Sequence, residues 1–409
     1  MHQKLIVMKP FRNTIMLFAL LTGTFFTGFA QQAGEKTVTG NNRFAFDLFN
    51  QVEKEGENVF FSPYSISSAL AMTYTGAEGV TQKEMQKVFG FSGDTKKQAK
   101  DYHLLNKHLD TLNDDKVELN VANSLWCQKD FKFLDDFLKI NKKYYQAGIK
   151  KVDYRNNHHG AREQINQWVE ENTNNKIKDL IQEGMLSPSV RLVLANAIYF
   201  KGMWEYPFDK SKTRPEFFYM SEKRKTRFPF MHRSVSVKYY EDELAQVIEL
   251  PYSGKDLSMM ILLPQQVSGI HELQSKLDEE LYREYQESMF SKEVDVWIPK
   301  FKMENSYNLN DPLINLGMKS AFSKGADFSG MTGKKELFIS DVAHKAFVEV
   351  SEEGTEAAAA TGVVMRKSSL VKKVEFKADH PFIYLIKDNR NGIILFMGRL
   401  NKPVYSGRM

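Results

Sequence analysis

The feature that most constrains this chain is a stretch of small side chains at residues 352–361, about fifty residues from the C-terminus. Its four consecutive alanines favour a helix, but Gly354 within the stretch, Gly362 after it and the two valines that follow oppose one. Read with a period of two, one face carries only small or apolar side chains up to Met365, and no charge before Lys367. The pattern predicts a surface loop that is able to become a strand of a β-sheet.

Segments on both sides of this stretch have strand character. Residues 337–350 read as a strand that runs towards the stretch, and residues 374–386 return to an apolar strand pattern. We therefore expect a loop at about 352–373, exposed from Thr355 to about Ser368, between two strands of the fold.

Five further motifs lie along the chain, before and after this loop. They lie at residues 58–72, at 194–204 followed by Pro207 and Phe208, at 298–301, at 378–382 and at 396–400. Together with the loop they closely resemble the serpins, a family of serine protease inhibitors, over nearly the whole chain after its first thirty residues. The resemblance implies an α+β fold, one domain with three β-sheets and eight to nine helices, and an exposed reactive-centre loop.

The resemblance assigns roles to the small-residue stretch. In an inhibitory serpin a target protease cleaves this loop, and the loop then inserts as a new strand of the main sheet while the protease is still attached. The hinge at which insertion begins would be Glu353, Gly354, Thr355, Glu356, Ala357, Ala358, Ala359, Ala360 and Thr361. Small side chains suit a strand that must be buried quickly, because burying a charge costs several kcal/mol.

The cleaved bond is expected within Arg366, Lys367, Ser368 and Ser369. The family's loop length places it after Ser368, which suits a protease with a small specificity pocket. A shift of one or two residues gives Lys367–Ser368 or Arg366–Lys367, and both suit trypsin-like enzymes with an acidic pocket. We favour Lys367–Ser368, because a charged side chain complements such a pocket better.

Polar residues in apolar segments give a second set of candidates. Ser62, Ser65, Asn196 and His344 come from three separate segments, and buried polar groups must find hydrogen-bond partners. By resemblance they match the "shutter" beneath the main sheet of serpins, and Trp204 matches an aromatic at the "breach", where insertion begins. Ordinary roles remain open, namely a helix N-cap for Ser62 and core hydrogen bonding for Asn196.

The N-terminus is interpreted as a cleaved signal peptide at residues 1–30, followed by a serpin domain at 31–409. Three basic residues precede an apolar run, and Gly28 and Ala30 supply the small residues that a signal peptidase requires. An uncleaved membrane anchor is the alternative, but the run is short and interrupted. We expect a secreted inhibitory serpin from a bacterium, either released or held in the periplasm or at the cell surface.

Composition argues against a nucleic acid as the main partner. The net charge of +5 includes the three basic residues of the signal segment, so the remaining chain carries 5 − 3 = +2. Lys96, Lys97 and Lys100 form a small basic patch near a predicted helix start. A solvated helix face explains the patch better than a polyanion site, although a nearby helix binds polyanions in some serpins. The expected partners are target proteases bound covalently, namely trypsin-like, elastase-like or subtilisin-like serine proteases and also cysteine proteases. We expect a monomeric inhibitor and no membrane span.

We find no motif for an enzyme, a cofactor or a metal. A Gly-x-Ser-x-Gly sequence, a zinc-protease motif and a phosphate loop are all missing from the sequence. His158 and His159 lack further ligands at a matching spacing and read as a solvated loop. Cys127 is the single cysteine, so no internal disulfide forms. A non-inhibitory serpin, acting as a carrier or chaperone, is the main alternative to an inhibitor.

The remaining patterns predict helices early and strands later, as in an α+β fold. The helices are expected at 41–52, from an N-cap at Ser62 and Pro63 through Met72, from a capping box at 81–84 to Gly90, and at 161–173. Strands are expected at 117–125, throughout 192–263 and at 294–298, and the segment 192–200 is apolar on both faces, as in a central strand.

Overall fold

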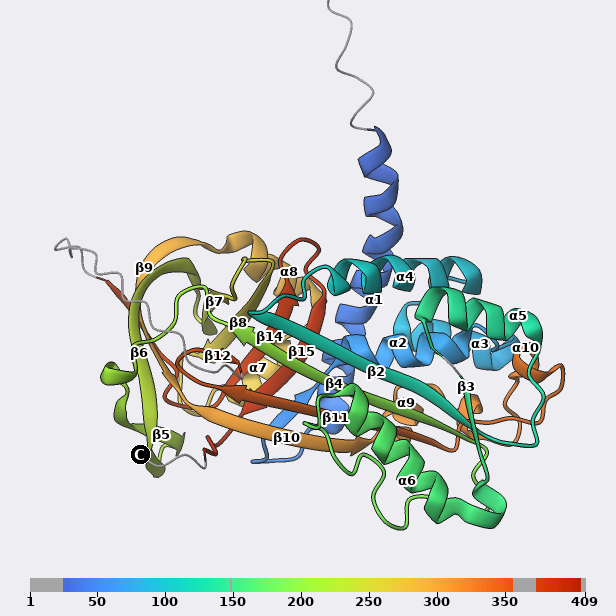
Figure 1. Cartoon of the computed structure of the whole chain (residues 1–409). Helices are drawn as coiled ribbons and strands as arrows, with labels where there is room; N and C mark the ends of the chain where they lie inside the picture. Colours follow the sequence, from blue (N-terminus) through green and yellow to red (C-terminus); the bar gives the residue numbers. More distant parts are fainter. Residues whose placement is uncertain (1–24, 148, 356–372, 406–409) are drawn as a thin grey trace, which may run out of the picture.

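The structure, a computed structural model, describes residues 25–147, 149–355 and 373–405, with side chains from residue 34 onward (Figure 1). Helices and strands both contribute, as expected for an α+β fold. The α-helices are α1 Phe25–Val52, α2 Pro63–Tyr74, α3 Gly79–Phe89, α4 Thr95–Asp110, α5 Asp135–Ile140, α6 Tyr154–Asn172, α7 Ile270–Lys276, α8 Glu279–Ser288, α9 Asn310–Asn315 and α10 Ser329–Thr332. Short π or 3₁₀ turns add η1 Asn141–Tyr145, η2 Lys210–Lys212 and η3 Ser320–Phe322. Within the described ranges, no helix is both apolar enough and long enough to cross a membrane.

A six-stranded sheet forms the centre of the molecule. Its order is β10 Phe301–Asn308, β11 Asp341–Val350, β12 Gly354–Thr355, β4 Leu192–Met203, β2 Val117–Gln128 and β3 Ile149–Val152. The strand β4 is buried along most of its length, as its doubly apolar pattern predicts. It pairs antiparallel with β2 and parallel with β11. In Figure 1, α6 crosses in front of this sheet, and it packs on β2 and β4.

The other strands form a nine-stranded hydrogen-bonded sheet, which bends at its longest strand, β6 Arg224–Glu241. The first part of β6 pairs with β5 Arg214–Ser221 and its last residues pair with β7 Ala245–Pro251. Its middle pairs with β9 Phe290–Pro299, which joins β13 Val374–Lys377. The sheet continues from β7 through β8 Leu257–Pro264, β14 Phe382–Asp388 and β15 Ile394–Leu400 to β1 Val59–Phe61. Because β6 serves both halves, the two smaller sheets of the expected three are continuous.

Several boundaries differ from the sequence-based prediction. The helix expected at 41–52 begins at Phe25, and the one expected at 161–173 begins at Tyr154. Residues 337–340 do not belong to β11, which starts at Asp341. The strand expected at 374–386 breaks at 378–381 into β13 and β14, which pair with different strands. A proline at 381 cannot donate a ladder hydrogen bond, which suits the break.

The capping box predicted at Thr81 and Glu84 is wrong. Helix α3 begins two residues earlier, and its N-cap, Glu78, makes no side-chain cap bond. The Thr81 hydroxyl accepts from the amide of Asp327 (2.9 Å), and the Glu84 carboxylate accepts from the amide of Ser320 (2.7 Å). Both side chains therefore hold the segment around η3 instead of the helix end. Gly90 ends α3 with a left-handed φ of 66°, as predicted.

Candidate functional site

The start of the proposed loop already lies inside the six-stranded sheet. The two residues of β12, Gly354 and Thr355, pair antiparallel with Met203 and Gly202 of β4, and Thr355 also pairs with Val350 of β11. Farther along, β11 and β4 pair directly with each other from residue 341 to residue 347. The sheet is therefore open at one end, by the width of one strand, and β12 fills this opening.

Thr355 is not part of an exposed loop, which corrects the sequence-based prediction. Its side chain is fully buried, and its hydroxyl hydrogen-bonds the Tyr252 hydroxyl at 2.8 Å. Gly354 before it has a φ of 153°, and a Cβ there would lie 2.0 Å from the carbonyl oxygen of Gly202. Only glycine fits against β4 at this point. The insertion thus begins with a residue that the sheet itself requires to be small.

Aromatic side chains and a backbone bond hold the chain at the entry to β12. The Trp204 indole donates to the carbonyl oxygen of Ser351 (3.0 Å), and its ring stacks on Tyr252 at 4.7 Å between ring centres. The Trp204 amide donates to the carbonyl oxygen of Glu353 (2.9 Å). The predicted breach residue therefore contacts the hinge directly, on both sides of Glu352.

A buried ion pair fixes Glu352 on the opposite side. Its carboxylate accepts from Lys300 Nζ and from the Thr213 hydroxyl, both at 2.8 Å. Burial acts to raise the pKa of Glu352, but the bonds from Lys300 and Thr213 outweigh it, so the pKa lies below its usual value. Glu353 forms a second ion pair with the exposed Lys210 at 2.6 Å. The first two carboxylates of the proposed loop are therefore held by ion pairs.

The second set of predicted residues comes together in a row across four strands. Asn196 on β4 is the register partner of Asn123 on β2 and of His344 on β11, and His344 is in turn the partner of Tyr307 on β10. Asn196 donates to the Ser65 hydroxyl (2.6 Å) and to Asn123, and its carbonyl oxygen bonds His344 Nδ1. We call Ser62, Ser65, Asn123, Asn196 and His344 the central polar network.

Helix α2 supplies the other two members of this network, Ser62 at its N-cap and Ser65 in its first turn. The Ser62 hydroxyl caps α2 by accepting from the Ser65 amide (3.1 Å), as predicted, and it donates to the carbonyl oxygen of Leu395 (2.6 Å). The Ser62 amide donates to His344 Nε2 at 3.1 Å. That nitrogen is thus the acceptor, so the proton of the neutral ring lies on Nδ1, where it is donated to Asn196. Every polar atom of the imidazole is satisfied only while β4, β11 and α2 stay together.

The acid sensitivity of the network can be predicted from His344. Complete burial lowers the pKa of His344 to about 3, so the unfolded chain binds a proton there more readily than the native protein does. Between pH 7 and pH 5 this difference costs the native state about 2 kcal/mol of stability. Asp341 at the start of β11 opposes the effect, since burial raises its pKa to about 6 and its protonation on acidification stabilises the folded state.

A comparison of wild type with His344→Gln isolates the histidine, because Asp341 contributes equally to both proteins. Glutamine does not titrate, so we expect the stability advantage of wild type over the variant to shrink by about 2 kcal/mol between pH 7 and pH 5. Chemical denaturation at both pH values measures this. A constant difference would show that His344 is not held neutral by burial.

Other residues singled out in the sequence do not assemble into a site. His158 and His159 lie within α6 and not in a loop, with ring centres 4.3 Å apart, and the described residues contain no group of side chains that could hold a metal ion. Cys127 is buried in β2, where desolvation raises the pKa of its thiol to about 12. Lys96, Lys97 and Lys100 are exposed on the first turns of α4, in accordance with the expected helix start.

The rest of the hinge and the scissile bond lie outside the described residues. These are Glu356, Ala357, Ala358, Ala359, Ala360, Thr361, Arg366, Lys367, Ser368 and Ser369. Their roles stay predictions.

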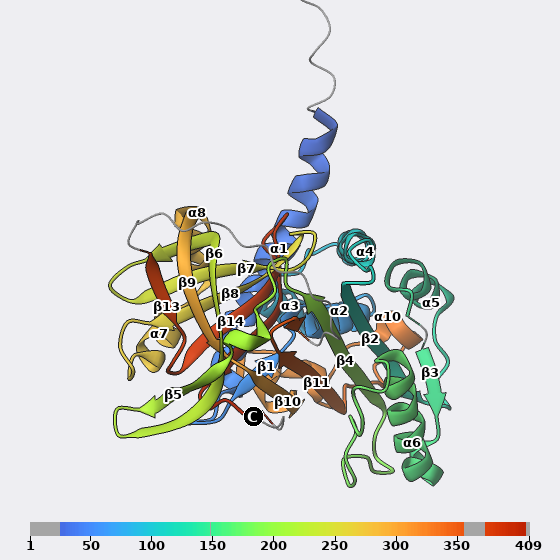
Figure 2. The same ribbon diagram turned by 60° about the vertical axis from the view of Figure 1, so that its left-hand side comes forward.

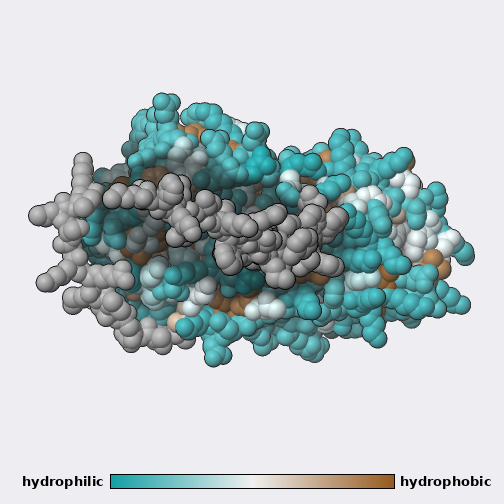
Figure 3. Space-filling model, turned by 90° about the horizontal axis from the view of Figure 1, so that it is seen from above, coloured by the Kyte–Doolittle hydropathy of each residue, from teal (hydrophilic) through white to brown (hydrophobic). Residues whose placement is uncertain are grey.

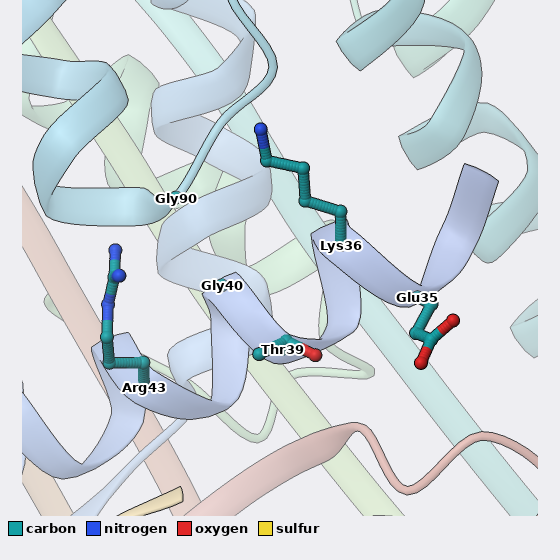
Figure 4. Close-up of a pocket in the computed structure, with 6 residues that line it drawn as sticks. All are labelled: Glu35, Lys36, Thr39, Gly40, Arg43 and Gly90. Atoms are coloured by element: carbon teal, nitrogen blue, oxygen red, sulfur yellow. The ribbon is translucent and has the colours of Figure 1, made fainter. Parts of the chain in front are cut away.

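A surface hollow lies far along the chain from the hinge, where α1 meets the end of α3 (Figure 4). It has a volume of about 420 Å³ and is lined by Glu35, Lys36, Thr39, Gly40, Arg43 and Gly90. Figure 4 shows Lys36 and Arg43 directed to one side and Glu35 to the other. Arg43 donates to the carbonyl oxygen of Lys87 (2.9 Å), which ties it to the fold. The hollow is open to solvent, and its lining side chains do not resemble a reactive centre.

From above, the described surface is mostly hydrophilic, with small separate apolar areas (Figure 3).

Several partners of the candidate residues were not predicted from the sequence. Asn123 stands in an apolar strand pattern, the same signal that identified Asn196, and could have been found. Tyr252 and Thr213 gave no signal, and Lys300 was quoted only as part of the motif at 298–301, because each lies far from the hinge in the sequence and reaches it only through the fold.

Comparison with known proteins agrees with this geometry. A family model described as "Serpin (serine protease inhibitor)" matches residues 39–403. Human Serpin B3 is 43% identical over 383 residues, which cover 89% of this chain and 98% of that protein. The leukocyte elastase inhibitor of Bos taurus is 41% identical over 90% of this chain and its own full length. The crystal structure of human thyroxine-binding globulin complexed with its ligand superposes with a TM-score of 0.84, at 31% identity, over 91% of this chain and all of that one.

This chain belongs to the serpin family. The α+β serpin fold is therefore confirmed. Inhibitory type, secretion and bacterial origin stay predictions.

Proposed function

We propose that this protein is a secreted protease inhibitor that is consumed in the reaction, as a suicide substrate. The observation that carries the proposal is the position of β12. Gly354 and Thr355 occupy the opening between β11 and β4, and the predicted small-residue hinge follows them directly. The next residues of the loop can extend β12 along the line between β11 and β4, if these strands separate.

The proposed mechanism begins with an ordinary proteolytic attack. The catalytic serine of the protease attacks the carbonyl of Lys367, the amine of Ser368 leaves, and an ester joins the protease to the new end of the loop. The loop then extends β12, which requires the direct β11–β4 pairing to open. The 12 residues from 356 to 367, at about 3.3 Å each, carry the protease roughly 40 Å. Distortion of the protease's serine and oxyanion hole then stops hydrolysis of the ester.

Proteases that differ in their specificity pocket test both the inhibition and the cleaved bond. Incubation with a trypsin and with an elastase should give, on a denaturing gel, a band at the summed mass that resists boiling. With trypsin we expect mass spectrometry to find a released fragment of residues 368–409, because Lys367 fits an acidic pocket. A fragment that begins at Lys367 or at Ser369 would instead place the scissile bond after Arg366 or after Ser368. Active protease and cleaved chain without a complex would contradict inhibition.

A non-inhibitory carrier is the second candidate, and the similarity to thyroxine-binding globulin favours it. The two candidates differ in what cleavage does to stability. An inhibitor stores its loop outside the lowest-energy position, so the cleaved protein should melt at a higher temperature than the intact one. A carrier that does not insert its loop should show no gain. Calorimetry of the cleaved and intact forms decides between them.

The secretion part of the proposal rests only on the sequence of residues 1–30, the proposed signal peptide. The proposed serpin domain follows at 31–409. N-terminal sequencing of the protein from its producing cells tests the secretion part. We expect the mature chain to begin at Gln31, because Gly28 and Ala30 fit the signal peptidase. A chain that retains the leader would contradict this part and leave the inhibition mechanism intact.

A further inference from the structure

A basic and aromatic surface lies on the hairpin that joins β5 to β6. Among the described strands, β5 pairs only with β6, so the hairpin stands at an edge of its sheet. Phe217 is the register partner of Arg227, and Tyr219 is the partner of Lys225. Since alternate residues of a strand share a face, these four side chains lie on the same face of the hairpin. Two aromatic rings and two cations therefore form one continuous surface.

The cations of this surface have aromatic rings as neighbours, and the exposed Glu222 is an acidic residue at the same turn. Lys225 Nζ lies 4.4 Å from the ring centre of Phe217, and the Arg227 guanidinium lies 4.9 Å from the same ring. Lys223 and Arg224 add two more exposed cations at the turn. Among the ion pairs of the described chain, none involves any of these four cations. Residues 222–227 thus carry four cations and one carboxylate, a net positive charge, while the rings of Phe217 and Tyr219 are half-buried.

The hairpin is attached to both ends of the proposed loop. Glu216 of β5 pairs with Lys377 of β13 (3.1 Å), and β13 begins just after the loop. The Tyr219 amide donates to the carbonyl oxygen of Asp379 at 2.7 Å. At the other end, Lys210, which precedes β5, pairs with Glu353 at the start of the loop. Figure 2 shows β5, β6, β9 and β13 together on one side of the molecule.

We propose that the β5–β6 hairpin is a second docking surface for the target protease, and that it binds acidic side chains on that protease. This rests on the proposed function, because a protease that attacks the loop is brought beside the hairpin. Exposed cations steer an acidic partner and raise its association rate. Aromatic and arginine side chains at the centre of such a contact supply much of the binding energy.

Cations and aromatic rings would also suit a single-stranded nucleic acid. The position beside both loop ends favours the protease. The nucleic acid is therefore an outcome of the test.

Two trypsins with the same specificity pocket but opposite net charge provide the probe. We expect the triple variant Arg224→Gln, Lys225→Gln, Arg227→Gln to associate with the anionic trypsin about tenfold more slowly at low salt. The cationic trypsin should be inhibited at an unchanged or higher rate. The control is Lys96→Gln, Lys97→Gln, Lys100→Gln on α4, which removes the same charge on the opposite side of the molecule in Figure 2. Its rates should equal those of wild type.

Each result has a definite reading. Equal rates for wild type and triple variant with the anionic trypsin would overturn the docking surface. The docking surface would also be overturned if the triple variant lost binding to a single-stranded DNA 20-mer while its association rates with both trypsins stayed unchanged. If the triple variant is less stable than wild type, two other tests take its place: the single variant Arg224→Gln, and the salt dependence of the wild-type association rate up to about 0.3 M. Salt should screen the charges and remove the rate advantage of the anionic trypsin. Failure of wild type to form a boil-resistant complex with either trypsin would instead contradict the proposed function.

Discussion

Thr355→Arg is expected to convert the protein from an inhibitor into a substrate. An arginine at this position would bring a charge into the fully buried place that Thr355 occupies between β11 and β4. An unpaired buried charge costs several kcal/mol, and each 1.4 kcal/mol added to the barrier of insertion slows it about tenfold. Deacylation should then outrun insertion, and the number of inhibitor molecules consumed per protease should rise at least about tenfold.

The same substitution should also alter the uncleaved protein, since Thr355 is already inserted. The hinge can keep an arginine only by leaving the sheet, which would break the Tyr252 bond and disturb the contact of Trp204 with Ser351. A shift in tryptophan fluorescence reports this. Thr355→Ser is the matched control, because it keeps the hydroxyl, and it should behave like wild type. Unchanged inhibition by Thr355→Arg would contradict the insertion mechanism.

Asn196→Ala is expected to cause the largest loss of stability among single changes in the central polar network. Alanine leaves the His344 Nδ1 proton without its acceptor and removes the donor to Ser65 and Asn123. Each unsatisfied buried group costs about 1–3 kcal/mol, so we expect a total loss of about 3 kcal/mol. For a chain of this size that loss lowers the melting temperature by about 4 °C.

A second asparagine of the same sheet gives the control for this prediction. Asn120 on β2 is only half-buried and bonds the neighbouring Glu118, so Asn120→Ala should change stability by less than about 0.5 kcal/mol. Calorimetry of both variants makes the comparison. If Asn196→Ala melts with wild type, the row across the four strands does not hold the sheet together.

Local sequence patterns were sufficient for many elements. Ser62 caps α2 and Gly90 ends α3, because both effects depend on residues within one turn. Residues 192–200 were expected as a central strand, since a run of apolar side chains on both faces needs cover on both faces. Of the residues quoted by resemblance, Ser65 and His344 are joined through Asn196, and Trp204 separately contacts Ser351 and Glu353; their roles stay predictions.

Patterns failed where a side chain had two possible partners. Thr81 and Glu84 have the spacing of a capping box, yet both bond the segment around residues 320–327. Nothing near Thr81 in the sequence signals that segment, which only folding brings within reach. The strand pattern at 337–350 likewise could not say that pairing with β4 starts at Asp341.

The sequence by itself determined that Thr355, Ala357, Ala359 and Thr361, which alternate along one face, are small and uncharged, because side-chain volume and charge belong to each residue alone. Only the tertiary structure shows that the loop has already entered the sheet as far as Thr355. Thr355 is buried because β11 and β4 leave a gap of one strand at this end, and Tyr252, Trp204 and Lys300 hold the chain in it from distant parts of the sequence. Such contacts depend on the register of strands, and register is fixed by the whole sheet.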